Sequence, residues 1–309
     1  MAERAPSYGG QAVIEGVVMR GPRFAAMSVR APDGEIVTLV KKAEMPSQRG
    51  GVFRWPIVRG ALSFIDSLSL GIEMLVKSAE ISMPEQEAPS KASVNIAVAA
   101  GGLIAVGLFV ALPAYAAPFI LNALRLSGRV YTSLVELMLR ITLLVGYISA
   151  VSRMKDIQRV LQYHGAEHQV IWAWENHHGD PEVSRENWNR EAAVSLLASK
   201  AAGYSRLHPR CGTSFLFLVA LCSWFVFIFV SPPNVIDRII VRLLLMPLVA
   251  GLSYEALKAS AGHEGIIWEI IRAPGIGLQK LTTRTPDASQ LEVAANSLAL
   301  LIEAERGVS

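Results

Sequence analysis

Long apolar stretches limit the folds open to this chain of 309 residues more than any other feature. Residues 92–124 contain no charged side chain. At about 1.5 Å per residue, a helix of this length exceeds the hydrocarbon core of a bilayer, which is about 30 Å thick. Three further windows, at 130–151, 211–236 and 239–254, have the same apolar character. We therefore predict a mainly α, multi-pass membrane bundle of about four transmembrane helices.

The charge content agrees with this prediction. Charged residues make up 18% of the chain and hydrophobic residues 52%, whereas soluble domains are about 25% charged. The net charge of +3 comes without a dense Lys/Arg run, so we expect membrane lipids and not nucleic acid as partners. Cys211 and Cys222 would lie about 16 Å apart along one helix, too far for a disulfide bond. The cysteine content is typical of a reducing compartment.

The first 55 residues predict a small β-rich segment. Its stretches of β-branched residues are AVIEGVVMRG, FAAMSVRAP and EIVTLVKKA. Pro32-Asp33-Gly34 separates the second stretch from the third and predicts a hairpin there.

Residues 56–82 predict an amphipathic helix whose charges form one stripe. Such a helix lies either in the membrane interface or against other helices, and the sequence leaves both open. The membrane bundle would cover 92–258, with a cytosolic insertion at 152–210. The tail, 259–309, would end in a soluble helix, with Thr285 as its N-cap and Pro286 at its first position.

Basic residues predict the orientation of the bundle. Most Lys and Arg residues lie in the N-terminal segment, the 152–210 insertion and the tail. Because positive loops stay on the cytoplasmic side, we expect a multi-pass protein of the bacterial cytoplasmic membrane with both termini cytosolic. Within the spans, Glu136 and Arg140 are spaced for an internal ion pair, and Arg242 would face the bundle or extend to the interface.

The most specific local motif is YHGAEH at 163–168. His164 and His168 are one helical turn apart, so both imidazoles face the same way and could share a metal ion. The string also fits H-x-x-E-H, in which the glutamate, here Glu167, activates water. A hydrogen-bonded histidine pair without a metal explains the spacing equally well. We further expect the second apolar helix to continue into this segment.

A second cluster, RLHPRCG at 206–212, lies at the start of the third apolar window. His208 and Cys211 could supply a third and a fourth ligand. Three ligands and a water would make a catalytic site, and four would make a structural one. Cys211 is otherwise a small buried residue. Arg206 and Arg210 are candidates for interfacial anchors or for contacts with an anionic headgroup.

Four blocks of the sequence resemble the YqhQ-like family of bacterial membrane proteins. They are GGQAVIEGVVMRGP (9–22), YHGAEH (163–168), SRLHPRCGTSF (205–215) and LQKLTTRTPDASQLEVA (278–294). The family has no known function and is described as predicted metal-dependent enzymes. The resemblance implies a multi-pass membrane protein with a metal site that involves His164, Glu167, His168, His208 and Cys211. It also points to Gln11, Glu15 and Arg20 in the glycine-rich opening.

Three functions follow as hypotheses. The first is a zinc-dependent hydrolase with His164, His168 and His208 as ligands, Glu167 as general base and Cys211 nearby; Glu255 is a reserve ligand, because inverted zinc peptidases take a downstream glutamate. The second is a non-enzymatic scaffold or partner-binding protein with a structural zinc site. The third is a lipid-handling or transport protein, suggested by the charged residues within the spans.

Overall fold

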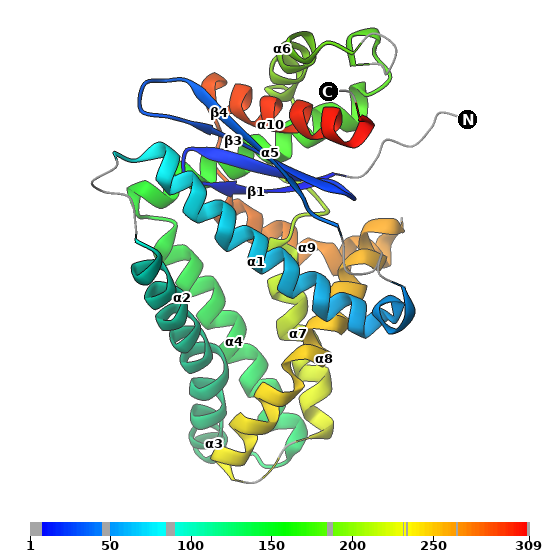
Figure 1. Cartoon of the computed structure of the whole chain (residues 1–309). Helices are drawn as coiled ribbons and strands as arrows, with labels where there is room; N and C mark the ends of the chain where they lie inside the picture. The colour runs from blue at the N-terminus through cyan, green and yellow to red at the C-terminus, as the bar shows by residue number, and fades with distance from the viewer. Residues whose placement is uncertain are drawn as a thin grey trace.

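The computed structural model describes residues 8–44, 50–84, 90–183, 188–230, 232, 234–263 and 265–307. Two layers make up the molecule (Figure 1). A four-stranded sheet with several helices forms a head at one end, and long helices extend from it. Residues 1–7 and 45–49 of the expected β-rich segment lie outside the described residues.

The sheet is antiparallel, with its strands in sequence order. The strands are β1 (Gly9–Val13), β2 (Gly16–Arg20), β3 (Phe24–Arg30) and β4 (Ile36–Lys42). The expected first stretch makes two strands because a tight turn divides it at Glu15, whose φ is 51°. The predicted hairpin at 32–34 is confirmed, with Gly34 at a φ of 91° in the β3–β4 turn.

Helices α5 (Lys155–His177) and α10 (Ala288–Arg306) cover one face of the sheet. Helix α6 (Arg190–Ala201) packs on these two helices and completes the core of the head. The Ser297 hydroxyl of α10 contacts the backbone carbonyls of Val17 and Ala26, at 3.1 and 3.0 Å, and so ties the helix to β2 and β3. The prediction for the start of this helix is wrong by two residues. Asp287 is the N-cap and forms a reciprocal capping box with Gln290.

The remaining helices lie below the sheet in Figure 1. They are α1 (Pro56–Ser82), α2 (Lys91–Val106), α3 (Leu112–Leu124), α4 (Arg129–Val151), α7 (Thr213–Phe229), α8 (Val235–Gly262) and α9 (Ile266–Thr282). A π-helical turn, Gly107–Ala111, joins α2 to α3. The expected continuation of the second apolar helix into the histidine segment is wrong, because α4 ends at Val151 and α5 begins separately at Lys155.

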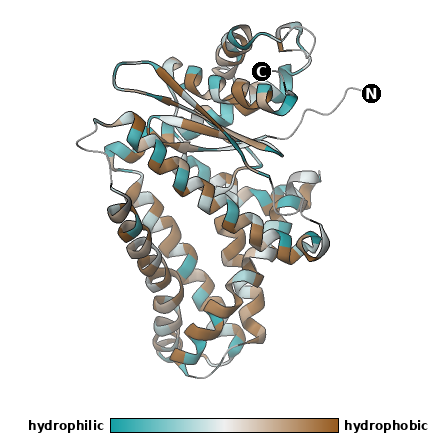
Figure 2. Ribbon diagram, in the orientation of Figure 1, coloured by the Kyte–Doolittle hydropathy of each residue, from teal (hydrophilic) through white to brown (hydrophobic). Residues whose placement is uncertain are grey.

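Two helical segments in the described part of the chain are long and apolar enough to cross a membrane, Ala92–Leu124 and Arg129–Val151. Only 11% and 17% of their most apolar windows is buried within the protein, whereas a core helix of a soluble protein is mostly buried. Figure 2 shows hydrophobic residues along these helices. Of the four predicted spans, the third is the shorter helix α7, and the fourth lies within α8, which carries the buried Arg238 and Arg242.

Charged side chains inside this helical layer share one carboxylate. The predicted pair of Glu136 and Arg140 is present, with 3.3 Å between nitrogen and oxygen. Arg242 approaches the same carboxylate to 2.5 Å, and Arg238 lies 3.9 Å from it. Arg140 and Arg242 both lie 5.2 Å from the ring centroid of Phe227. Glu136 therefore balances charge from two helices, and not from its own helix alone.

Candidate metal centre

Helix α5 carries the two histidines on a face that packs closely against the C-terminal part of the chain. A Cβ atom on Gly165 would lie 2.0 Å from the carbonyl oxygen of Arg284. The amide of Arg284 donates to the carbonyl of Leu161 at 2.8 Å. The close approach requires glycine at position 165, and it places residues 282–284 beside His164.

Backbone carbonyls fix the protonation of both imidazoles. Nδ1 of His164 lies 2.7 Å from the carbonyl oxygen of Thr282, and Nδ1 of His168 lies 2.6 Å from that of Arg206. A carbonyl only accepts hydrogen bonds, so each Nδ1 must carry the hydrogen. In this tautomer each Nε2 offers a lone pair, the arrangement found around histidine ligands of metals. Burial lowers the pKa of His168, which favours this neutral form.

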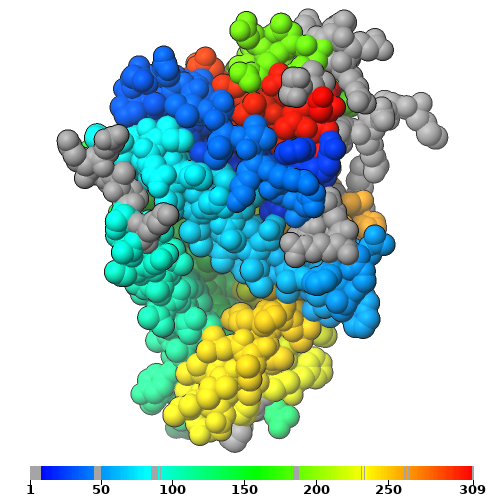
Figure 3. Space-filling model, viewed as in Figure 1, coloured from blue at the N-terminus to red at the C-terminus, as the bar shows by residue number. Residues whose placement is uncertain are grey.

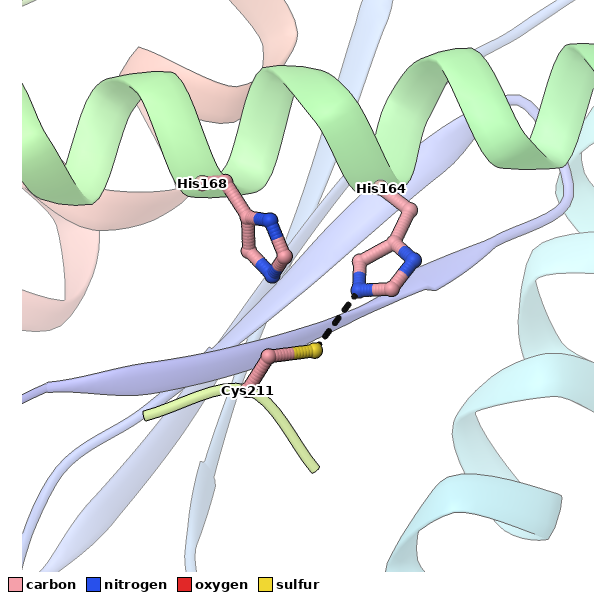
Figure 4. Close-up of side chains that lie close together, drawn as sticks. All are labelled: His164, His168 and Cys211. Atoms are coloured by element: carbon pink, nitrogen blue, oxygen red, sulfur yellow. Dashed lines mark hydrogen bonds between the residues drawn. The ribbon is translucent and has the colours of Figure 1, made fainter. Parts of the chain in front are cut away.

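Cys211 completes a group of three donor atoms. It lies between α6 and α7, and its Sγ is 3.3 Å from Nε2 of His164. The donor atoms of His164, His168 and Cys211 all lie within 4.8 Å of one another (Figure 4). Nε2 of His168 is buried and has no hydrogen-bond partner among the described residues. Two imidazoles and one thiol, with this nitrogen unsatisfied, form a group that could hold a metal ion.

Glu167 lies at the edge of the same group. Its Oε2 is 3.8 Å from Nε2 of His164 and 3.7 Å from Nε2 of His168. Burial raises the pKa of Glu167, and His164, His208 and the Gly10 amide oppose that shift. A Cβ on Gly10 would lie 2.8 Å from Cγ of Glu167. The glycine-rich opening therefore makes room for this carboxylate.

His208 lies beside the group of three and outside it. Its ring centroid is 5.8 Å from that of His168. Gln279 of α9 holds its backbone, accepting from the amide at 2.7 Å and donating to the carbonyl at 2.8 Å. Nδ1 of His208 accepts from the Arg210 amide at 3.3 Å, which leaves the hydrogen on Nε2. Burial lowers the pKa of His208 to about 4, so the ring is neutral at pH 7.

A cavity of about 650 Å³ contains all of these groups. Strands β1 and β2 line one wall, and Gln11 and Arg20 belong to it. Ser67 and Leu70 of α1 line another part, and α5 with residues 208 and 210–213 makes up the rest of the lining. The candidate site thus lies where the head meets the long helices.

The other predicted site residues are engaged elsewhere. Glu255 lies outside the group, and its carboxylate pairs with Arg59 at 2.9 and 2.5 Å, between α8 and α1. Glu15 pairs with Arg159. The Arg206 guanidinium donates to the Thr283 carbonyl, while the backbone carbonyl of Arg206 accepts from Nδ1 of His168.

Arg210 and Arg20 also have carboxylate partners. Arg210 pairs with Glu175, and Arg20 pairs with Asp66. Sequence reasoning missed the supporting residues Thr282, Gln279 and Glu175. Two of these act through backbone contacts or hold a backbone in place, for which the sequence carries no local signal.

Comparison with known proteins gives a family and no described activity. A family model described as "Protein of unknown function (DUF1385)" matches residues 55–304. The chain is 29% identical to "Uncharacterized protein YqhQ" of Bacillus subtilis (strain 168), over 97% of this chain and 93% of that protein. No solved structure matches the chain.

Proposed function

This chain belongs to the DUF1385 family of proteins of unknown function, and we propose that it is a membrane-anchored, zinc-dependent hydrolase. The observation that carries the proposal is the convergence of two Nε2 lone pairs and one thiol beside a buried carboxylate, within a cavity. Three protein ligands and an open position are typical of catalytic zinc sites. When bound, zinc would polarise the scissile group and acidify a water molecule.

The chain's own residues have separate parts in the proposed reaction. His164, His168 and Cys211 hold the metal, and Glu167 accepts the proton of the attacking water. The water oxygen bonds to the carbonyl carbon or the phosphorus of the substrate. The bond to the leaving oxygen or nitrogen breaks, and Glu167 returns the proton to that atom. The neutral His208 belongs to the cavity wall, with its Nε2 3.6 Å from Oε2 of Glu175.

The membrane anchor is part of the proposal. Ala92–Leu124 and Arg129–Val151 are the first two spans, and their exposed apolar surfaces support this assignment. We assign α7 and α8 as the third and fourth spans. With this assignment, Glu136 of α4 pairs with Arg242 of α8 inside the bundle. The basic residues of the head support an orientation with both termini in the cytosol of a bacterial cell.

Metal analysis tests the proposal directly. The full chain, purified in detergent, should contain about one zinc ion, and a His164→Ala/His168→Ala double variant should lose it. Glu167→Gln should keep the zinc and lose hydrolysis of the ester, amide or phosphodiester compounds that the wild type cleaves. A folded wild type that neither contains zinc nor takes it up overturns the proposal.

One observation favours a second candidate, a non-enzymatic scaffold with a structural zinc site. Oε2 of Glu167 is nearly equidistant from the two Nε2 atoms, so it could close the coordination as a fourth ligand. Glu167→Gln would then weaken zinc binding, which distinguishes this candidate from the hydrolase. A transport role has less support. Arg140 and Arg242 each pair with Glu136, and none of the three lines the cavity.

A further inference from the structure

Helix α1 has three distinct faces. Its buried face includes Leu70 and Met74, which pack toward the sheet. A charged stripe runs along a second side, where Asp66 pairs with Arg20 of β2 and Glu73 pairs with Lys41 of β4. These ion pairs place the charged stripe toward the head of the molecule.

Large apolar side chains occupy the third face of α1 and remain partly exposed, although Phe64 also stacks on Phe215 of α7. They are Phe64, Ile65, Leu68 and Leu75, which are between 37% and 58% exposed. At 3.6 residues per turn they lie on the side opposite the charged stripe. Figure 3 shows α1 crossing the viewed face between the sheet and the long helices, with its surface uncovered.

The exposed apolar face continues the apolar surface of the long helices. Gly60 of α1 and Gly251 of α8 meet closely; a Cβ on Gly60 would lie 2.7 Å from the Gly251 carbonyl oxygen. Side chains of α2 and α4 are exposed as well, such as Leu103 at 73% and Met138 at 50%. Large apolar side chains with so much exposed surface are stable in contact with lipid. A helix with one charged side, one apolar side and a protein contact between them is typical of the membrane interface.

The same helix forms part of the cavity that holds the candidate metal centre. Ser67 and Leu70 line it, one residue before and two residues after Leu68 on the outer face. The cavity also contains apolar groups, Val160 and Leu161. Its polar groups include Arg20, whose buried Nε has no hydrogen-bond partner among the described residues. A cavity with both kinds of lining, beside an interfacial helix, suits an amphipathic molecule.

We infer that the substrate is a bilayer lipid, which enters the cavity from the membrane surface along α1. Its acyl chains would contact Leu70, Val160 and Leu161, and Nε of Arg20 would donate to a headgroup oxygen. The scissile bond would then lie near Glu167. This inference rests on the proposed hydrolase function for its chemistry, but lipid binding itself does not require the metal.

Photo-crosslinking of the full chain in vesicles tests the inference. Benzoylphenylalanine would replace Leu70, in the cavity, or Met74, on the same face one turn further but in the core. The vesicles would contain phosphatidylethanolamine and phosphatidylglycerol, and mass spectrometry would detect adducts. We expect a lipid adduct at position 70 and none at position 74, in metal-loaded and metal-stripped protein alike. A label at Leu68 serves as the positive control for bilayer contact.

The outcomes separate this inference from the proposed function. An adduct at position 68 but none at 70 overturns the lipid inference, even when the protein contains zinc. An adduct at 70 in a protein that binds no zinc supports the lipid site and overturns only the hydrolase. Since a bulky group at position 70 could disturb folding, the same label at Val160, on another wall, repeats the measurement. Absence of an adduct at Val160 in folded protein also overturns the inference.

Discussion

Sγ of Cys211 lies 3.3 Å from Nε2 of His164, although 47 residues separate them in the chain. Gln279 holds the backbone of His208 through two hydrogen bonds, and the Cys211 amide donates to the His208 carbonyl at 3.3 Å. The thiol is thus positioned by α9, a helix distant from both residues in sequence.

Replacing Cys211 should change the metal spectrum without unfolding the protein. Thiolate coordination to Co²⁺ gives a charge-transfer absorption band, so cobalt-loaded wild type should show this band and Cys211→Ser should lose it. Cys222→Ser is the matched control, since Cys222 packs beside Val226 and Phe227 in the helical layer. A band that persists in Cys211→Ser would exclude the thiol as a ligand.

The two glycines of β1 should differ sharply in their tolerance of a methyl group. A Cβ on Gly10 meets Cγ of Glu167 and the Val18 carbonyl at 2.8 Å, whereas a Cβ on Gly9 meets nothing within 4 Å. Gly10→Ala should displace Glu167, lower hydrolytic activity and cost about 1–3 kcal/mol of stability from overpacking. Gly9→Ala should resemble the wild type in turnover and thermal unfolding. Equal activity in both variants would contradict the assigned place of Glu167.

Packing of α5 against residue 284 should make Gly165 sensitive to substitution. In Gly165→Ala the added Cβ would lie 2.0 Å from a backbone oxygen, which the helix can relieve only by moving. We expect a loss of about 3 kcal/mol or more, with weaker zinc binding because His164 moves too. Gly203→Ala, where the nearest atom is at 3.5 Å, should unfold at the wild-type temperature. An unchanged Gly165→Ala would mean that α5 packs differently.

Periodicity alone predicted that His164 and His168 share a face, because helical spacing is a local property. The first hypothesis took His208 as the third ligand and placed Cys211 nearby, whereas the structure groups Cys211 with the two histidines and leaves His208 beside them. Tertiary packing, including the hydrogen bonds of Gln279 to the His208 backbone, sets these positions, and no spacing rule contains it. Glu255 was a reasonable reserve ligand by analogy, but its pairing with Arg59 depends on how α1 crosses α8.

The strands and apolar helices followed the sequence, but several turns and helix boundaries did not, among them the break between α4 and α5. The left-handed turn at Glu15 divides one β-branched stretch into β1 and β2, and β-branched composition does not mark such a turn. Likewise, Thr285-Pro286 resembles a helix start, but the capping box between Asp287 and Gln290 begins α10 later. The number of spans was harder to predict, because α8 contains Arg238 and Arg242. Both arginines are buried beside Glu136 of α4, a tertiary contact that the sequence of α8 does not show.

The cap of α10 should make part of the head's stability depend on pH. Burial alone would raise the pKa of Asp287, but hydrogen bonds from Ser289 and Gln290 outweigh it and hold the pKa below its ordinary value. The stabilisation is therefore complete above the unfolded-state pKa and is lost as pH falls through the lower folded-state value. At pH 7, Asp287→Ala should lose about 1 kcal/mol.

Asparagine in place of Asp287 separates the effect of capping from that of ionisation of the carboxyl group. Asp287→Asn caps without ionising, so its stability difference from the wild type should shrink as pH falls below about 4. Thermal unfolding at several pH values, followed by circular dichroism, gives the measurement. A difference that stays constant with pH would show that the carboxylate charge of Asp287 contributes nothing to the cap.

Removing the carboxylate of Glu136 should be the most damaging single change within the helical layer. Glu136 and Arg242 are both fully buried, and the carboxylate also contacts Arg140. Glu136→Gln leaves buried arginines without a counter-charge, which costs about 3–5 kcal/mol when one partner of a buried pair is lost. Glu136→Gln/Arg242→Met should recover part of this loss, because it removes a buried charge together with its partner. Glu269→Gln, at an exposed site on α9, controls for loss of a carboxylate as such. Unfolding in detergent ranks the stabilities of the three variants. A Glu136→Gln variant as stable as the control would mean that lipid or water, and not this carboxylate, compensates the charge of the arginines.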